Sequence, residues 1–359
     1  MEHCFIHPMF KTQIITPVHK KDSRAIAANY RPISLTSHVI KIYERIIRKK
    51  LVTHLEKNKI LCKNQHGFQK GRSCLTQLLK HINEILFNLN EGSDTDVIYL
   101  DFEKAFDKVD HDILLAKLQN YKITGSLFNW LEEYLKDRKQ IVVVDGSKSH
   151  PAEVQSGVPQ GTVLGPILFL IYINDMEGCV KDCIVSHFAD DTRIKKAINY
   201  TSDVNSLQYD LNSVVEWSNV NNMSLHEKKF EFLCHSTKQN KMIHELPFRD
   251  EFYTYTTPTG IKIQQKNIVK DLGIYITPDL NWTPHVNTIT ESAKKNFIMV
   301  FERLQNSQKR NHVNTLQDPC TQQNRIFKST LGSQQNYRYS NPRISSKKFY
   351  IPNRRIFRL

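Results

Sequence analysis

The stretch IVSHFADDTRI, residues 184–194, sets two adjacent acidic residues between two apolar segments. Its pattern predicts a strand over Ile184–Ala189, a tight turn at Asp190-Asp191 and a returning strand over Arg193–Ile198. Neighbouring carboxylates repel each other, so they are tolerated best on a solvated turn or around a cation. The stretch therefore predicts an antiparallel hairpin whose tip is either a plain polar turn or a metal-binding one.

A third carboxylate follows another apolar run. Val97-Ile98-Tyr99-Leu100 has the composition of a buried strand, and Asp101 stands at its end. Taken alone, Asp101 fits the N-cap of a helix equally well. Adjacent strands of one sheet lie ~4.8 Å apart, so carboxylates at two strand ends can share two cations ~3.5–4 Å apart, as in phosphoryl-transfer enzymes. Oxygen ligands favour Mg²⁺, with Mn²⁺ as a substitute.

The rest of the pattern predicts helices that back a sheet, an α+β fold. Helical spacing of apolar residues marks residues 39–55, 75–89, 111–120, 128–135 and 203–221, with Asp110 capping the third of these helices. Ile141–Val144 is a predicted strand that ends at the turn Asp145-Gly146. Gln160–Ile173 is predicted as a buried helix or, because of Pro166, a helix with a broken start. Asn29–Leu35 is expected to be a loop that leads to a helix.

The net charge of +14 is distributed unevenly. Residues 1–80 contain 16 Lys and Arg against 4 Asp and Glu, and residues 301–359 contain 12 against 2, whereas residues 81–300 have a net charge of −8. Basic segments on both sides of an acidic one suggest a phosphate-binding surface beside a carboxylate site, although a basic chain can also be merely soluble.

Cysteine usage and hydropathy bound the class of protein. The seven cysteines contain no CxxC pair, which disfavours a disulfide framework or a zinc site and fits an intracellular, reducing compartment. Cys179 and Cys183 are the nearest pair, without a second pair of ligands. The longest apolar run, Val163–Ile173, is shorter than the ~18 residues of a membrane span, so it is expected to lie in the core.

The motifs resemble, in order, those of reverse transcriptases of non-LTR retrotransposons, the jockey-like and related LINE elements. The resemblance runs from about Lys11 to about Lys295, and His226 stands where the family more often has Asn. The segments that carry it are PVHKK (17–21), NYRPISL (29–35), QHGFQKGRS (65–73), DFEKAFD (101–107), SGVPQGTVLGP (156–166), FADD (188–191), NMSLHEKK (222–229) and DLGI (271–274), the last resembling the primer-grip region.

The resemblance implies a right-hand polymerase fold with a reverse transcriptase domain over residues 11–280. Fingers are expected over about 11–95, the palm over about 96–280 and the start of a thumb over 281–300. The usual upstream endonuclease and helical thumb are not recognisable in this sequence. The thumb is therefore expected to be incomplete, and the basic tail at 301–359 to be poorly ordered.

The resemblance also implies roles for individual residues. Asp101 and Asp190 would hold the metal ions, with Asp191 beside them. Phe106 would exclude a ribose 2′-hydroxyl and so favour dNTPs, unless it is a plain core aromatic. Gln160, next to Gly161, would contact the incoming nucleotide, unless these residues form an ordinary turn.

Basic residues complete the implied site. Lys20, Lys21 and Arg31 would contact triphosphate or template phosphates, with a solvated surface as the alternative. Lys229 would protonate the leaving pyrophosphate, unless it is a surface lysine. Asp107 is expected to be structural.

The implied activity is RNA-directed DNA polymerisation, a two-metal nucleotidyl transfer onto a primer 3′-hydroxyl. RNA template, DNA primer or target and dNTPs would be the partners, and no membrane is implied. The main alternative is a catalytically silent, truncated remnant that at most binds nucleic acid. An RNA-templated RNA polymerase is disfavoured by Phe106. The family's way of life implies the nucleus, with the cytoplasm as the alternative, and the oligomeric state is left open.

Overall fold

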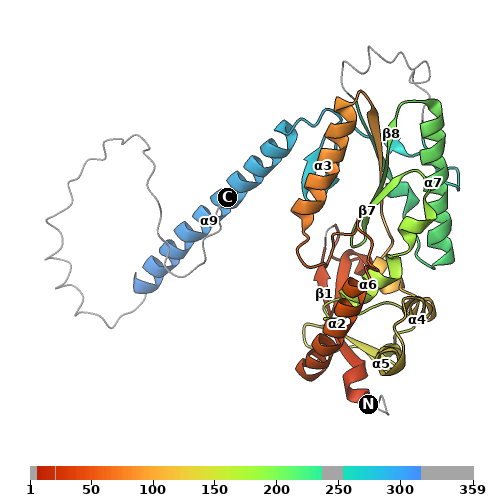
Figure 1. Ribbon diagram of the computed structural model, residues 1–359. Coiled ribbons are helices and arrows are strands. Elements are labelled where there is room, and N and C mark those ends of the chain that lie inside the picture. Colours follow the sequence, from red (N-terminus) through yellow and green to blue (C-terminus); the bar gives the residue numbers. More distant parts are fainter. Residues whose placement is uncertain (1–5, 21, 237–253, 317–359) are drawn as a thin grey trace, which may run out of the picture. The chain divides into compact units, whose positions relative to one another are not determined.

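The computed structural model describes residues 6–20, 22–236 and 254–316 (Figure 1). The chain divides into two compact units, residues 1–288 and 289–359. All strands of the described residues lie in the first unit, and helix α9 (Thr283–Leu316) begins there and continues into the second. Helical structure thus extends past residue 300, where the sequence predicts a change of character. The rest of the predicted tail, residues 317–359, lies outside the described residues.

A five-stranded central sheet organises the first unit. Its strand order is β10-β9-β3-β8-β7, with β3 antiparallel to both β8 and β9. The predicted strands at Val97–Leu100 and on both sides of the FADD motif are confirmed. The bounds are β3 (Asp94–Leu100), β7 (Ile184–Phe188), β8 (Asp191–Ile198), β9 (Glu231–His235) and β10 (Gln264–Gln265).

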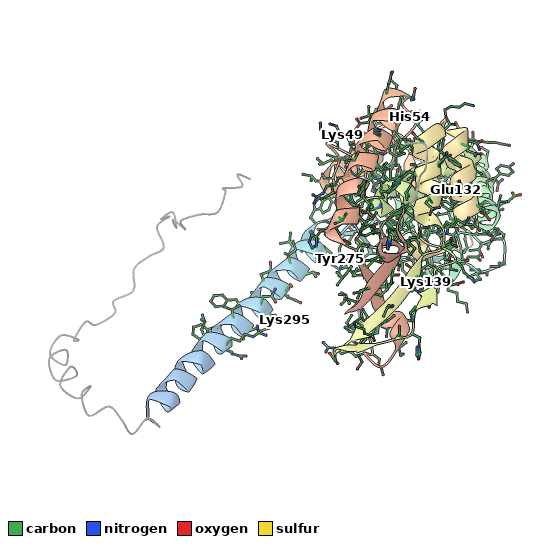
Figure 2. The ribbon with its side chains drawn as sticks, turned by 90° about the horizontal axis from the view of Figure 1, so that it is seen from below. Lys49, His54, Glu132, Lys139, Tyr275 and Lys295 are labelled. Carbon is green, nitrogen blue, oxygen red and sulfur yellow. The ribbon has the colours of Figure 1, made fainter. Side chains whose placement is uncertain are left out.

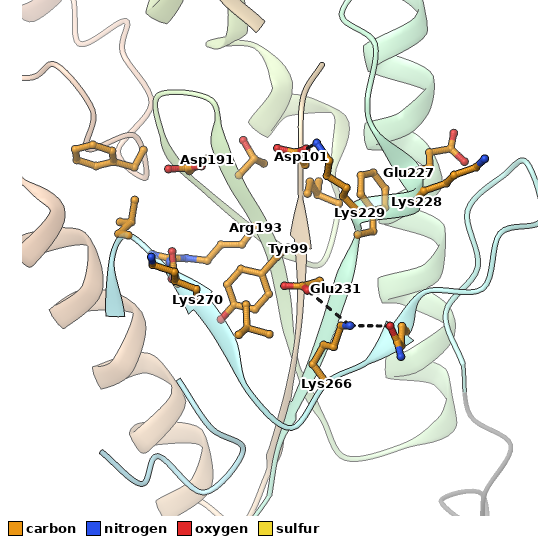
Figure 3. A pocket seen from close by; sticks show the side chains of 18 of the residues that line it. Tyr99, Asp101, Asp191, Arg193, Glu227, Lys228, Lys229, Glu231, Lys266 and Lys270 are labelled. Carbon is orange, nitrogen blue, oxygen red and sulfur yellow. Dashed lines mark hydrogen bonds and ion pairs between the residues drawn. The ribbon is translucent and has the colours of Figure 1, made fainter. Parts of the chain in front are cut away.

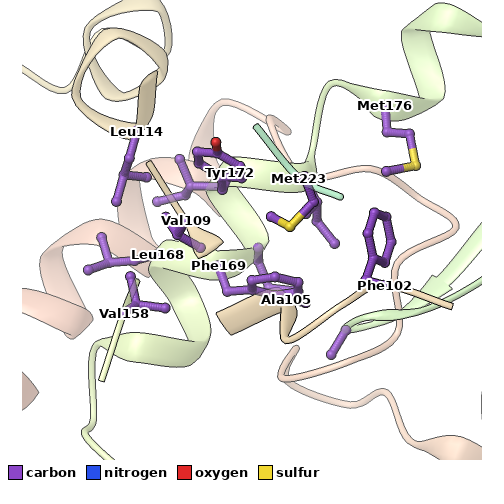
Figure 4. Close-up of a cluster of buried hydrophobic side chains, with 14 of the residues drawn as sticks. Phe102, Ala105, Val109, Leu114, Val158, Leu168, Phe169, Tyr172, Met176 and Met223 are labelled. Carbon is purple, nitrogen blue, oxygen red and sulfur yellow. The ribbon is translucent and has the colours of Figure 1, made fainter. Parts of the chain in front are cut away.

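Helices and one face of the central sheet enclose the main core. Helix α6 (Gly165–Ile173) is buried on all sides, so it lies at the centre of the main core (Figure 4). It begins at Gly165 and not at Gln160, because Pro166 lacks an N–H and is tolerated only in the first turn. The core is completed by helices α4 (His111–Asn120), α5 (Gly125–Leu135) and α7 (Thr201–Val220).

The opposite face carries helix α3 (Cys74–Asn90) and the hairpin β11 (Val269–Asp271)–β12 (Ile274–Ile276). Figure 1 shows α3 and α7 on either side of the central strands. The apolar cluster on this face is small: Leu78, Leu233, Val269 and Ile276. Much of the contact is instead polar, because the Lys195 ammonium of β8 donates to Glu84 and contacts His81 of α3.

A second sheet joins strands from the beginning of the chain to strands from the middle of the first unit. Strand β2 (Tyr30–Leu35) pairs with β1 (Thr12–His19), which pairs in parallel with β4 (Lys139–Val144). The prediction of a loop over Asn29–Leu35 is therefore wrong, because β2 is an edge strand that tolerates Pro32. Short strands β5 (Ser147–Lys148) and β6 (Ala152–Glu153) also pair with β4. Residues 139–153, expected in the palm, thus complete the sheet of the expected fingers.

The predicted helices are present, with ends shifted by a few residues. Helix α2 spans His38–Lys57, and a short helix α1 (Pro8–Lys11) precedes β1. Asp110 caps α4 by accepting from the Asp112 and Ile113 N–H groups at 3.0 and 3.1 Å. Buried Glu44 connects α2 to α5 by accepting from the Tyr134 hydroxyl at 2.7 Å. Figure 2 shows Lys49 of α2 and Glu132 of α5 at the surface of the first unit.

Candidate active site

The central sheet brings the three predicted carboxylates to one edge. Strand β3 ends at Leu100, which pairs with Thr192 of antiparallel β8, so Asp101 follows β3 where Asp191 begins β8. Phe188 pairs with Asp191, and the two residues at the hairpin corner are Ala189 and Asp190. The turn was predicted one residue too late, because Ala189 adopts a φ of 57° that the sequence does not announce.

A preceding loop supports the hairpin from behind. The Gln65 side-chain carbonyl accepts from the N–H groups of Gly67 and Ala189 at 2.7 and 3.0 Å. The His66 N–H donates to the His187 carbonyl at 2.9 Å. A Cβ on Gly67 would lie 2.4 Å from the Ala189 nitrogen, so glycine is required for this close approach. Sequence reasoning assigned no role to Gln65 or Gly67, because this packing depends on residues far away in the chain.

The surroundings of Asp190 and Asp191 raise the pKa of both carboxyl groups. Asp190 and Asp191 remain accessible at the hairpin tip, although the surrounding protein removes part of their hydration. That desolvation raises the pKa of Asp190, and the Asp101 charge raises it further. The pKa of Asp191 rises to about 6, first through desolvation and then through Asp190 and Asp101. Clustered carboxylates of this kind are stabilised by a cation.

Asp101 already has a cationic partner. The Lys229 ammonium donates to its carboxylate at 2.7 Å, and both side chains are about half exposed. The loop that carries Lys229 is held to β3 because the His226 N–H donates to the Asp101 carbonyl at 2.7 Å. As they stand, no three His, Cys, Asp or Glu side chains of the described residues converge enough to hold a metal ion. The sequence thus predicted that these residues lie at one edge of the sheet but did not predict the ion pair between Lys229 and Asp101.

A cavity of about 640 Å³ opens beside these carboxylates (Figure 3). Asp101 and Asp191 line it together with the β11–β12 hairpin residues Val269–Leu272. Its wall is rich in cations: Lys20, Arg193, Lys228, Lys229, Lys262, Lys266 and Lys270. A cavity lined by cations beside carboxylates suits a polyanion that must reach an acidic site.

Phe106 lies close to Asp101 but is supported from the core. It belongs to a short 3-10 helix, Ala105–Lys108, and its ring stacks on Phe169 of α6 with centroids 4.3 Å apart. Phe68 meets its edge at 6.3 Å. Phe106 is only half-buried, so the ring is both packed against the core and accessible. The two alternatives raised by the sequence, core aromatic and nucleotide contact, are thus compatible.

Gln160 lies next to a second cavity, of about 420 Å³. The Gln160 side-chain amide donates to the Asp107 carboxylate at 3.0 Å. The Gln160 backbone carbonyl accepts from the Ser34 N–H at 2.7 Å. Gly161 has a φ of +97°, and a Cβ there would lie 3.0 Å from the Ser34 carbonyl oxygen. Asp107, expected to be structural, thus contacts a predicted nucleotide-binding residue. Partial burial raises its pKa.

Two of the three predicted phosphate-binding cations lie near the hairpin tip. Lys20 follows β1 and lines the first cavity, and Arg31 pairs with Val18 in β2. The positive charges of Lys20 and Arg31 both act to lower the pKa of Asp190. Lys21 lies outside the described residues.

Comparison with known proteins places these motifs in one family. Residues 18–276 match the family model described as "Reverse transcriptase (RNA-dependent DNA polymerase)". The chain is 27% identical over 295 residues to the probable RNA-directed DNA polymerase from transposon BS of Drosophila melanogaster, which is 80% of this chain and 32% of that protein. It is also 27% identical over 274 residues to the RNA-directed DNA polymerase from mobile element jockey of Drosophila funebris, covering 74% of this chain and 29% of that protein. The chain thus spans less than a third of these relatives.

Among solved structures, the fold is similar to that of apo telomerase from Candida tropicalis truncated from the C-terminal domain. The TM-score is 0.52 at 12% identity, over 77% of this chain and 55% of that chain. A likeness at this identity concerns the fold alone. In the part of the chain that the structure describes, no helix has the length and apolar character of a membrane span.

Proposed function

This chain belongs to the reverse transcriptase (RNA-dependent DNA polymerase) family, and from that membership we propose that it adds deoxynucleotides to a DNA primer paired with an RNA template. The observation that carries the proposal is the register of β3 and β8. Leu100 pairs with Thr192, so Asp101, Asp190 and Asp191 lie at one edge of the sheet. Acids at this position are unfavourable for the fold, since desolvation and then neighbouring carboxylates raise the pKa of Asp190 and of Asp191.

The chemistry of the three carboxylates suits divalent cations, although binding would require the side chains to converge further and Asp101 to leave Lys229. Their donor set is all oxygen, and the pKa values of Asp190 and Asp191 are raised first by desolvation and then by neighbouring negative charge, both of which a bound cation would offset. We propose that Asp101 and Asp190, with Asp191 beside them, hold two Mg²⁺ ions, for which Mn²⁺ can substitute. When bound, such ions lower the pKa of the primer 3′-hydroxyl and offset charge on the phosphates.

The neighbouring side chains bind and orient the reactants. Lys229 is an ammonium 2.7 Å from Asp101, so we assign to it the proton donated to pyrophosphate. Phe106, supported by the Phe169 ring, would exclude a ribose 2′-hydroxyl. Gln160, oriented by Asp107, would contact the base or sugar of the dNTP.

Phosphate groups would be bound by basic residues on two sides of the acids. Lys20 and Arg31 approach Asp190 from the β1–β2 side, and we propose that they, with Lys21, contact triphosphate or template phosphates. The cavity lined by Lys228, Lys262 and other lysines is proposed to receive the end of the primer strand.

The test is primer extension on an RNA template with a DNA primer, dNTPs and Mg²⁺, with Asp190→Ala as the matched inactive variant. Extension by the wild-type chain alone supports the proposal. Phe106→Val is then expected to incorporate rNTPs more readily than the wild type. A folded chain that binds RNA in a salt-sensitive way, unchanged by Asp190→Ala, and extends no primer would indicate a silent remnant.

A further inference from the structure

A buried ion pair connects the catalytic strand to the β11–β12 hairpin. The Arg193 guanidinium of β8 donates to the Asp271 carboxylate at the end of β11. The two side chains are only 4% and 6% exposed. The pair is separated by 78 positions in the sequence, so its contact is created by the fold alone.

Arg193 lies on the same face of β8 as a catalytic acid. Side chains alternate along a strand, so Asp191, Arg193 and Lys195 point to one face of the central sheet. On that face Lys195 contacts Glu84 of α3, and Arg193 contacts the hairpin. Strand β8, which begins with Asp191, is therefore attached on this face to helix α3 and to the β11–β12 hairpin.

The hairpin depends on such contacts for its position. Its strands have three residues each, and a two-stranded hairpin of this size is marginally stable by itself. Its apolar contacts belong to a small cluster, in which Val269 and Ile276 are buried while Leu272 and Ile274 are only partly buried. Arg193 and Asp271 both line the cavity beside Asp101 and Asp191 (Figure 3).

A buried ion pair adds little net stability, because desolvation of the charges offsets their attraction, but it can specify one arrangement. The planar guanidinium makes directional hydrogen bonds to a carboxylate, which an apolar contact cannot do. The Arg193–Asp271 pair is therefore suited to fix a distance between two elements.

We propose that Arg193 and Asp271 are positioning residues, which hold the β11–β12 hairpin at a fixed distance from the catalytic carboxylates and so set the place of the primer end in the cavity between them. This inference rests on the proposed function. The rival role for Arg193 is direct contact with a primer phosphate, since its Nε and Nη2 have no hydrogen-bond partner among the described residues.

Substitution of Asp271 distinguishes the two roles. A carboxylate does not attract phosphate, so weaker primer binding on loss of Asp271 indicates positioning and not phosphate contact. The experiment measures KM for primer–template, KM for dNTP and kcat of Arg193→Met, Asp271→Asn and the double variant. Each single change is expected to raise KM for primer–template about tenfold, a loss of ~1.4 kcal/mol, with KM for dNTP changed less than twofold. The KM of the double variant for primer–template is expected not to exceed that of the more impaired single variant, since both substitutions remove the same interaction. Arg193→Lys is expected to recover part of the loss.

Controls separate positioning from charge and from folding. Lys196→Met removes an ion-paired cation of β8 that does not line the cavity, and an equal rise in KM for primer–template there would mean that loss of any positive charge from the strand causes the effect. Thermal melting identifies variants that are unfolded at the assay temperature. Unchanged primer binding in folded Asp271→Asn, or additive losses in the double variant, would overturn the proposal.

Fluorescence anisotropy with a labelled primer–template duplex gives the same comparison without chemistry. If the wild-type chain binds the duplex but does not extend it, the proposed function fails while the positioning role is still tested. The same pattern of roughly tenfold weaker binding supports the ion pair's role, and equal binding by wild type and Asp271→Asn rejects it.

Discussion

Replacing Gly67 with alanine would place a methyl group against the backbone of the β7–β8 hairpin, which carries the proposed metal ligand Asp190. The added Cβ would lie 2.4 Å from the Ala189 nitrogen and 3.1 Å from the Phe188 carbonyl carbon. Ordinary contact begins at 3.4 Å, so the hairpin or the Gly67 loop must move by about 1 Å. Both atoms belong to the backbone, so no flexible side chain can absorb the displacement. The same shift would strain the hydrogen bond from the Ala189 N–H to Gln65.

The substitution is expected to reduce the folding free energy modestly and the catalytic rate strongly. Overpacking of this kind typically costs ~1–3 kcal/mol of folding free energy, and a weakened hydrogen bond adds ~1 kcal/mol. A domain of this size is expected to remain folded at that cost, with a melting temperature lowered by several degrees. A displacement of a catalytic group by ~1 Å can reduce the rate ~100-fold. We therefore expect Gly67→Ala to be folded but slow.

The assay compares kcat for primer extension at saturating dNTP and primer–template, beside thermal melting of the same preparations. Gly71→Ala is the control for the added methyl group, because no atom lies within 4 Å of its added Cβ, although Gly71, unlike Gly67, has a positive φ of +74°. Alanine there costs ~1 kcal/mol of backbone strain and should leave kcat within about twofold. A folded Gly67→Ala chain with wild-type kcat would refute the reasoning that this contact places Asp190.

Three further changes test the electrostatics and the nucleotide site. Asp191→Asn should raise the melting temperature at pH 8, because the pKa of Asp191 is raised to about 6, so that its ionised form destabilises the fold. This gain in melting temperature should shrink as the pH falls through 6 toward the ordinary carboxyl pKa of ~3.9. Lys229→Met should strengthen Mg²⁺ binding about two- to fivefold in isothermal titration, because it frees Asp101 from a half-exposed ion pair, while kcat falls through loss of the proton donor. Unchanged Mg²⁺ affinity would mean that the ion pair does not compete. Asp107→Leu should raise KM for dNTP about tenfold by releasing Gln160, whereas Asp107→Asn, which keeps an acceptor, should lose less. A rise in KM for primer–template instead would place Asp107 elsewhere in the cycle.

Local patterns predicted the parts of the site that depend on neighbouring residues. The α+β reverse transcriptase fold is confirmed by the family match and the structural likeness. The apolar run before Asp101 forms β3, and the runs around Asp190 form β7 and β8. Strand periodicity and the order of motifs carry this information in short windows. Asp110 was likewise identified as a cap from its position before an apolar helix.

What the sequence did not reveal depends on contacts between distant segments. Tyr30–Leu35 is a strand only because β1 pairs with it, and nothing in its composition predicts that partner. The contacts of Gln65 with Ala189 and of Arg193 with Asp271 span 124 and 78 positions. Asp107 was expected to be structural, but the sequence did not indicate that the loop carrying Gln160 brings this side chain to Asp107. A single sequence contains no signal for such pairs.

The arrangement around β8 explains how three mutually repelling acids can share one edge of a sheet. Desolvation and mutual repulsion both oppose the ionised acids, and together they raise the pKa of Asp190 and of Asp191, which favours displacement of the hairpin. Contacts on two sides oppose that displacement. Gln65 and Gly67 hold the tip, whereas Arg193 holds the strand behind it. The first contact joins the β7–β8 turn to the Gln65–Gly67 loop, and the second joins β8 to the β11–β12 hairpin. A site that must keep carboxylates close before any cation arrives needs support of this kind, so variants of these contacts are expected to impair activity more than folding.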